Sequence, residues 1–232
     1  VGWEKWLLDM AGLATLSDMV PLQNENRVLA YWGLRVLRKS PRPGFRMLLQ
    51  SAGVDQKNLS EDDIAFMVTP RLNAASRMAS PMDAFKLLSA TDEKEAAALV
   101  IHLEKINQER KTLVATIMKK VKKVLDEREE KDIIVIGDPT WRIGILGLVA
   151  GKVADEYGKP TFVWGREGSS NGSVIKGSCR SPKGGNIVEL MRASSDAFLD
   201  LGGHALAGGF SVTEENIHTL EEKLLTAYKT MT

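Results

Sequence analysis

The first candidate for chemistry is a stretch in which two pairs of glycines surround one histidine. Residues 201–210 read Leu-Gly-Gly-His-Ala-Leu-Ala-Gly-Gly-Phe, with the pairs at Gly202, Gly203, Gly208 and Gly209. Glycine is used where the backbone takes a positive φ or lies close to a ligand, and successive amides can bind an anion. His204 can donate a hydrogen bond or carry charge near neutral pH. The pattern favours a tight, backbone-lined anion site over the alternative, a helix end followed by a turn.

Two stretches in the first half also carry polar residues that could bind a ligand. Asp18 lies between small and apolar residues, where a charge is rare unless it is paired or bound to metal. A simple turn aspartate is the alternative. Residues 70–77 read Pro-Arg-Leu-Asn-Ala-Ala-Ser-Arg, and arginine makes forked contacts with phosphate. Arg71, Asn73 and Arg77 are candidate anion ligands, unless the arginines lie on a surface loop.

Composition limits the classes of function. Of the 232 residues, 44% are hydrophobic and 26% are charged, as in ordinary globular proteins. Lys and Arg number 31 against 30 Asp and Glu, so an anion site must come from local clustering of charge. The single cysteine, Cys179, excludes an internal disulfide and fits a reducing compartment such as the cytoplasm. We expect neither a membrane span nor a signal segment.

Helices are expected to dominate the first part of the chain. From about residue 91 to residue 128, apolar residues recur at spacings of three and four, with no Pro or Gly between them. At ~1.5 Å per residue, such a helix spans about 50 Å and suits a connector between two lobes. An earlier helix is expected to begin at Ser60 and to end near Pro70.

The composition changes after a charged break at residues 127–131. A strand at 131–138, a helix ending near 158 and a strand at 159–164 form a β–α–β unit, which predicts a parallel pair. A turn at 165–171 and a strand at 173–181 follow. The second half is therefore a small α/β domain.

Ligands of open α/β sheets bind where loops leave the carboxyl ends of strands. Arg142, Ser178, Arg180 and His204 all lie near such loops in the expected order of elements. We therefore expect these four polar groups to converge on one cleft.

Five motifs, in order along the chain, resemble those of one family. Residues 201–210 are similar to the Gly-Gly-His-x-x-Ala-Gly-Gly motif of the DHH-associated domain of DHH phosphoesterases. The other four resemble motifs of the RecJ branch, which contains single-strand-specific 5′→3′ DNA exonucleases. These are residues 14–22 (Gly/Ala-Thr-x-x-Asp-x-x-Pro-Leu), 70–77 (Pro-Arg-Leu-Asn-Ala-Ala-Gly-Arg), 141–147 (Trp-His-x-Gly-Val-Ile-Gly) and 176–181 (Lys-Gly-Ser-x-Arg-Ser).

The resemblance implies a domain organisation within the α/β class. Residues 1–40 would be the tail of the DHH catalytic lobe, and residues 41–130 a helical linker region with the long connector helix. Residues 131–232 would form the DHH-associated, substrate-binding domain with a mixed sheet.

The resemblance also implies roles for residues in the first half. Asp18 would be a ligand of a Mn²⁺ or Mg²⁺ pair. Arg71, Asn73 and Arg77 would face the scissile phosphate or the strand. Gln108, on the long helix, would contact the DNA track.

In the second half, Ser178, Arg180 and His204 would hold the 5′ end of the strand or nearby phosphates, together with the backbone of both glycine pairs. Two positions differ from the family pattern. Arg142 stands where the family usually has histidine, so a fixed cation replaces a switchable donor. Ser76 stands in place of a glycine, which is a mild change.

The metal centre of the family needs several aspartates and an Asp-His-His motif. This sequence has no Asp-His-His, and Asp18 alone cannot hold two ions. With Asp18, Arg77 and His204 as predicted catalytic residues, we still expect this chain alone to bind no metal and to be inactive. It resembles the C-terminal part of an enzyme whose catalytic lobe precedes it.

The function implied is the substrate-binding part of a metal-dependent exonuclease on single-stranded DNA, active in DNA repair and recombination. One alternative is a DHH phosphodiesterase that acts on short oligonucleotides or cyclic dinucleotides. Another is a non-catalytic nucleic-acid-binding module. We also expect self-association through an exposed apolar surface near the start of the chain, or disorder there. Its residues are Trp3, Trp6, Tyr31 and Trp32.

Overall fold

The chain divides into two compact units, Val1–Arg110 and Lys111–Thr232. The computed structural model describes residues 2–166 and 174–231, so most of the turn expected at 165–171 lies outside the described residues. The division falls inside helix α6 (Glu93–Asp126), which is the long helix that the apolar spacing predicted. No helix of the described residues is long and apolar enough to cross a membrane.

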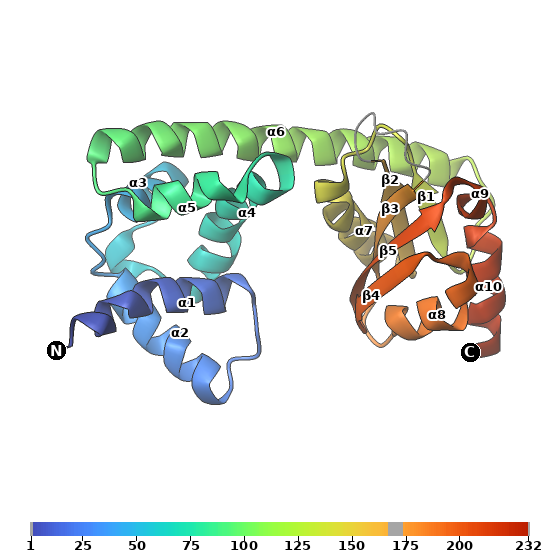
Figure 1. The fold of residues 1–232 in the computed structure, drawn as a ribbon, viewed down its shortest axis with the longest axis horizontal. Helices are drawn as coiled ribbons and strands as arrows, with labels where there is room; N and C mark the ends of the chain where they lie inside the picture. Colours follow the sequence, from blue (N-terminus) through green and yellow to red (C-terminus); the bar gives the residue numbers. More distant parts are fainter. Residues whose placement is uncertain (1, 167–173, 232) are drawn as a thin grey trace. The chain divides into compact units, whose positions relative to one another are not determined.

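The first unit is helical (Figure 1). Its elements before α6 are η1 (Trp3–Leu7), α1 (Leu8–Ser17), α2 (Asn24–Leu37), α3 (Pro43–Ala52), η2 (Gln56–Asn58), η3 (Asp63–Val68), α4 (Thr69–Met78) and α5 (Pro81–Ser89). Its core is built from buried aliphatic side chains and Phe45, and its leucines include Leu37, Leu48, Leu87 and Leu103. Because residues 3–17 and 24–37 are helical, the structure does not show the disorder considered above for this region.

A buried ion pair joins α1 to the segment between α2 and α3. Asp9 is only 3% exposed, and its Oδ2 accepts hydrogen bonds from Nε of Arg42 at 2.7 Å and from Oγ of Ser40 at 3.1 Å. A buried carboxylate is tolerated where charge and hydrogen bonds compensate it. The pair therefore fixes the start of α3 against α1.

The helix expected between Ser60 and Pro70 extends further than the sequence indicated. Ser60 and Asp63 form the predicted capping pair, since the amide of Asp63 donates to Oγ of Ser60 and the amide of Ser60 donates to Oδ2 of Asp63. The chain then continues through the π-helix η3 into α4. Pro70 lies in the first turn of α4, directly after the π-helix. The end expected near Pro70 was therefore wrong, and residues 70–77 are helical rather than a loop.

The second unit contains a five-stranded mixed sheet in the order β1-β2-β3-β5-β4. The strands are β1 (Ile134–Gly137), β2 (Thr161–Gly165), β3 (Val174–Arg180), β4 (Asp200–His204) and β5 (Ala207–Thr213). The predicted parallel pairing of β1 with β2 is confirmed, whereas β3, β4 and β5 add antiparallel pairs. The expected α/β class with a mixed sheet is therefore correct.

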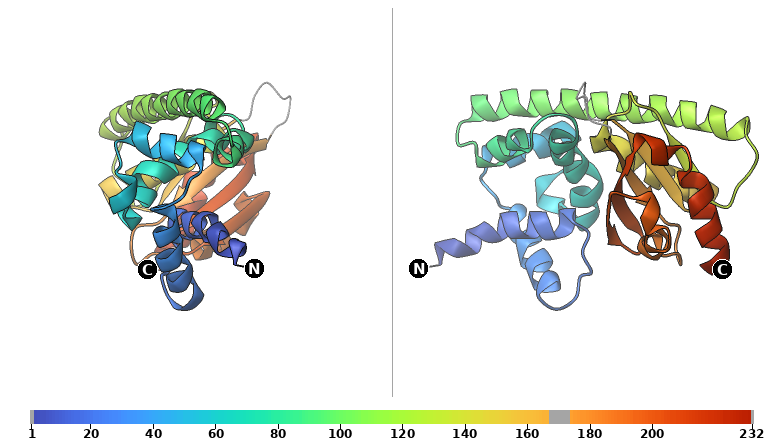
Figure 2. Two further views of the ribbon diagram at one scale, coloured as in Figure 1. Left: turned by 90° about the vertical axis from the view of Figure 1, so that its left-hand side faces the viewer. Right: turned by 45° about the vertical axis from the view of Figure 1, so that its right-hand side comes forward.

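Helices cover the two faces of this sheet unequally (Figures 1 and 2). The helices are α7 (Ile143–Tyr157), α8 (Ile187–Ala193), η4 (Ser195–Ala197), α9 (Glu214–Ile217) and α10 (Leu220–Met231). On one face, α8, α9 and α10 enclose a core that includes Phe162, Ile175 and Phe210. On the other face, α7 packs against β2 and β3. The β4–β5 part of that second face stays open, because Gly202, His204 and Gly209 are exposed there.

Candidate nucleic-acid interface

The glycine-rich stretch forms a β-hairpin. Strands β4 and β5 pair antiparallel, so that Gly202 lies opposite Gly209 and Gly203 lies opposite Gly208. Only Ala205 and Leu206 lie between the two strands. The helix end considered as the alternative is therefore not present, and the glycines lie on paired strands rather than in a loop.

Two of the four glycines are required by the fold itself. Gly203 has a φ of +142°, and a Cβ there would lie 2.3 Å from the carbonyl oxygen of Ala207. A Cβ on Gly208 would lie 2.8 Å from both the carbonyl oxygen of Gly202 and Cε of Met191. Sterics alone therefore explain glycine at these two positions, without any ligand.

The other two glycines face open space. A Cβ on Gly202 would meet no atom within 4 Å, and a Cβ on Gly209 would meet only the carbonyl oxygen of Gly177 at 3.8 Å. The fold would therefore accept a side chain at both positions. Because glycine is also used where another molecule comes close to the backbone, this pair marks a surface on which a ligand can lie.

Polar side chains border these two glycines on the same face. Residues directly opposite in a sheet point to one side, and the row through Ser178 crosses Gly209 and reaches Gly202. The next row contains Arg180, Ala207 and His204. We call Gly202, Ala207 and Gly209 the glycine floor. The hydroxyl of Ser178, the guanidinium of Arg180 and the imidazole of His204 thus lie beside the glycine floor.

Arg180 is held in place by the chain around it. Its Nη1 donates a hydrogen bond of 2.8 Å to the carbonyl oxygen of Cys179. Its Nη2 lies beside α7, where a Cβ on Gly147 would be only 2.8 Å away. Gly147 therefore leaves room for the guanidinium next to the floor. The sequence included Gly147 in a motif but did not show this contact.

The structure does not bring Arg142 to the glycine floor. Arg142 precedes α7 and is exposed, beyond the carboxyl ends of β1 and β2. Arg180 lies opposite Thr161, the first residue of β2, because β3 runs antiparallel to β2. Of the four groups expected to converge, three share one face of the sheet, namely Ser178, Arg180 and His204. Arg142 lies at the opposite end of the strands.

An acidic residue borders the floor on its other side. One row beyond Ser178, Lys176 lies opposite Ser211, which lies opposite Asp200. Asp200 is exposed and would repel a phosphate placed next to it. The charge of Arg180 favours an anion at the end of the floor that carries Arg180 and His204, whereas Lys176 and Asp200 in the other row carry opposite charges. No sequence signal indicated the position of Asp200, because it depends on strand register.

In the first unit, Asp18 follows the last residue of α1 and is exposed. The turn is held near α4, because Oγ1 of Thr69 donates to Oγ of Ser17 at 2.7 Å. Within residues 2–166 and 174–231, no three His, Cys, Asp or Glu side chains form a group that could hold a metal ion. The described residues therefore do not fit a two-metal centre, and Asp18 stays a predicted single ligand.

The remaining candidates lie on α4 and α6. Asn73 is exposed and Arg77 is half-buried, four residues apart on α4, so they lie on neighbouring turns of one face. Arg71 is already engaged, because Nε pairs with Glu104 and Nη1 donates to the carbonyl oxygen of Met67 at 2.6 Å. A phosphate contact by Arg71 would require exchange of Glu104. Gln108 is exposed on α6.

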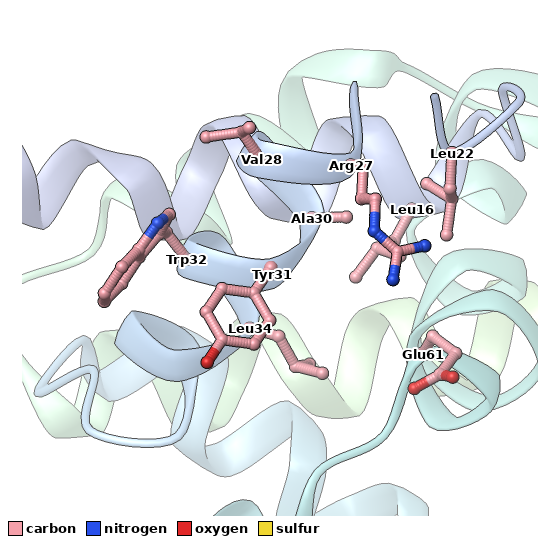
Figure 3. Close-up of a pocket in the computed structure, with 9 residues that line it drawn as sticks. All are labelled: Leu16, Leu22, Arg27, Val28, Ala30, Tyr31, Trp32, Leu34 and Glu61. Carbon is pink, nitrogen blue, oxygen red and sulfur yellow. The ribbon is translucent and has the colours of Figure 1, made fainter. Parts of the chain in front are cut away.

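Apolar side chains on η1 and α2 are exposed, as the sequence indicated. Trp3 and Trp6 on η1 are 68% and 55% exposed, and Tyr31 and Trp32 on α2 are 54% and 48% exposed. A cavity of about 480 Å³ opens beside Tyr31 and Trp32 (Figure 3). It is lined mainly by apolar side chains, with Arg27 and Glu61 as its charged groups. Self-association through this surface stays a prediction.

Cys179 should be unreactive in the native protein. Its thiol is buried in the core of the second unit, and burial raises its pKa to about 12. Since the thiolate is the nucleophile, we expect native protein to react with a thiol reagent at least ~100-fold more slowly than protein in urea. Following the reaction with and without urea at pH 8 tests this. Complete reaction of the native protein within minutes would contradict the buried position.

Comparison with known proteins supports the family resemblance inferred from the motifs. A family model, the DHHA1 domain, matches residues 119–230. The single-stranded-DNA-specific exonuclease RecJ of Bacillus subtilis is 32% identical over 219 residues, which cover 94% of this chain and 28% of that protein. RecJ of Thermus thermophilus is 34% identical over 206 residues, which cover 89% of this chain and 29% of that protein. This chain thus spans less than a third of the length of either relative.

Solved structures agree with the fold. The crystal structure of RecJ in complex with Mn²⁺ from Thermus thermophilus matches 97% of this chain and 33% of that chain, with a TM-score of 0.85 and 30% identity. The corresponding complex with Mg²⁺ matches with a TM-score of 0.84. This chain is therefore RecJ-like over most of its length, and its residues 119–230 match the DHHA1 domain.

Proposed function

We propose that this chain is the substrate-binding part of a RecJ-like, metal-dependent exonuclease and that it binds single-stranded DNA. The observation that carries the proposal is the pair Gly202 and Gly209, whose open faces lie opposite each other where the fold would accept side chains. A phosphate of the strand would lie on the glycine floor, near Arg180 and His204. The similarity to single-stranded-DNA-specific RecJ exonucleases supports DNA as the strand.

The three polar side chains beside the glycine floor would each contact the phosphate in a different way. The guanidinium of Arg180 supplies charge and a forked pair of donors for phosphate oxygens. The hydroxyl of Ser178 and the imidazole of His204 can donate further hydrogen bonds. Because phosphate contacts release counterions, binding should weaken as salt rises.

In this proposal, the cleavage step belongs to the catalytic lobe of a RecJ-like enzyme. The described residues of this chain do not form a metal centre, so the catalytic lobe of a RecJ-like enzyme would hold the Mn²⁺ or Mg²⁺ ions, with Asp18 as one ligand from this chain. Those ions would supply the activated water for hydrolysis. A place in DNA repair and recombination within the cytoplasm follows from the same proposal.

Replacing Gly202 by alanine tests the glycine floor directly. We expect Gly202→Ala to fold normally, because its Cβ meets no atom within 4 Å, and to bind a 5′-phosphorylated single-stranded 12-mer about three- to tenfold more weakly. The methyl group would stand where the ligand approaches the backbone. Fluorescence anisotropy at low and high salt measures the affinity.

The matched control is Gly151→Ala on α7. A Cβ on Gly151 also meets nothing within 4 Å, and Gly151 lies on a helix outside the strand pairs that form the floor, so affinity should not change. Equal affinity of Gly202→Ala and wild type would remove the main support for the floor. If a dinucleotide bound as tightly as the 12-mer, the phosphodiesterase alternative would be favoured.

A further inference from the structure

The exposed side of α2 carries a row of basic and aromatic side chains. Residues four apart lie on one side of an α-helix, and Arg27, Tyr31 and Arg35 are spaced in this way. Trp32 is exposed beside Tyr31, and Lys39 is exposed in the turn after the helix. We call Arg27, Tyr31, Trp32, Arg35 and Lys39 the α2 face. It presents aromatic rings and positive charge together to solvent.

The packing of α2 against α1 fixes which side of α2 is exposed. The two helices come into contact at Gly12 and Gly33, where a Cβ on Gly33 would lie only 2.4 Å from Cα of Gly12. Ala30 and Leu37 are buried together with Gly33. Since α2 could turn the α2 face inward only by losing this close contact, the exposed position of the face is built into the fold.

Arg35 lies against both aromatic rings of the α2 face. Its guanidinium carbon is 5.0 Å from the centroid of the Tyr31 ring and 5.3 Å from that of the Trp32 ring, which is within the range of a cation–π contact. The two rings are 5.3 Å apart, edge to face, and each stays about half-exposed. Within residues 2–166 and 174–231, the three cations of the α2 face form no ion pair with a carboxylate. Their charge is therefore not neutralised by this part of the chain.

The cavity beside the α2 face adds space for a flat apolar group (Figure 3). Its volume of about 480 Å³ lies in the range of small-molecule sites, and its lining includes Leu16, Leu34 and Tyr31. Glu61 also lines the cavity and would repel a phosphate. The cavity therefore suits a base better than a phosphate, and phosphates would lie along the cations of the α2 face.

We propose that the α2 face binds single-stranded DNA, with bases stacked on Tyr31 and Trp32 and phosphates beside Arg27, Arg35 and Lys39. Aromatic rings that stack on bases, next to cations that contact the backbone, are the means by which proteins bind single strands of any sequence. This inference rests on the proposed function, because the ligand is the same strand. It adds a contact within the first unit that lies outside all five sequence motifs.

The charge of this segment distinguishes a nucleic acid from a second copy of the chain. Residues 24–39 contain four basic side chains and one acidic side chain. A polyanion complements this excess of positive charge. A symmetric contact between two copies would instead place the same cations against each other.

Strands with and without bases separate stacking from phosphate contacts. Anisotropy measures the affinity of each variant for a 5′-phosphorylated dT 12-mer and for an abasic 12-mer of the same charge. We expect Tyr31→Ala and Trp32→Ala each to bind the dT strand about tenfold more weakly, and the abasic strand within about twofold of wild type. Arg27→Ala should weaken the binding of both strands and lower the salt slope by about one.

Two control variants separate stacking from effects on folding and from general exposure of apolar groups. Tyr31→Phe keeps the ring and should bind both strands as wild type does. Phe85, on α5, is 62% exposed, and Phe85→Ala should change both affinities by less than about twofold. The melting temperature of every variant is measured beside its affinity.

The outcomes distinguish this inference from the proposed function. If Tyr31→Ala bound the dT strand as tightly as wild type while Gly202→Ala bound it more weakly, the α2 face would be excluded and the glycine floor retained. Equal losses for the dT and abasic strands in Tyr31→Ala would exclude stacking and overturn the inference. Absence of any binding by wild type would overturn both proposals. If wild type sedimented as a dimer and Trp32→Ala as a monomer, with equal affinity for DNA, the α2 face would be an interface between copies instead.

Discussion

Replacement of Arg180 by alanine should lower the affinity for single-stranded DNA by about 10- to 100-fold, which is the expected loss for hydrogen bonds to a charged group. The side chain lies in the same cross-strand row as His204, and its guanidinium rests against α7 at Gly147. The dependence of log affinity on log salt should become shallower by about one. Anisotropy at several salt concentrations measures both quantities.

Arg192 provides the control for this experiment. It lies in the last turn of α8, is exposed, and belongs to the helices on the opposite face of the sheet. Arg192→Ala should leave the affinity within about twofold of wild type. If Arg180→Ala and Arg192→Ala lost affinity equally, general charge rather than the glycine floor would explain binding.

The ion pair of Asp9 with Arg42 should contribute to the stability of the first unit. Asp9→Ala should lower the free energy of unfolding by about 2 kcal/mol, because Arg42, whose side chain is 30% exposed, loses its buried partner. Ser40 would also lose the acceptor of its hydroxyl. Urea unfolding followed by tryptophan fluorescence measures the change.

An exposed ion pair in the same unit serves as the control for the effect of burial on stability. Arg46 and Glu93 lie 3.7 Å apart with side chains that are 53% and 67% exposed, so Arg46→Ala should cost less than about 0.5 kcal/mol. If both variants unfolded at the same urea concentration, burial would not strengthen the pair of Asp9 with Arg42.

Local pattern was sufficient for the main elements of the fold. The long helix was expected at about 91–128 and lies at Glu93–Asp126, because its amphipathic spacing is unbroken. The parallel pair β1–β2 followed from strand, helix and strand in succession. The capping residue Ser60 was also predictable, whereas the π-helix after it, in which Ile64 and Val68 are buried, was not.

The candidate surface was only partly predictable, because it depends on register. The sequence showed four equivalent glycines at 201–210, and only strand pairing separates Gly203 and Gly208, which the fold requires, from Gly202 and Gly209, which it does not. Glycine-rich strands also lack the residue types that favour strands. The partner of Arg71 was not predictable, because Glu104 is 33 residues away in the chain.

Glycine at positions 202 and 209 lowers the stability of the sheet and leaves space for a ligand. Glycine inside a strand is less stable than alanine by roughly 0.5–1 kcal/mol, and nothing in the fold blocks a methyl group at Gly202. An engineer who optimised melting temperature alone would therefore replace it early. The resulting protein would be more stable and would bind its strand more weakly, so the frequency of alanine at Gly202 in laboratory evolution would report which property had been selected.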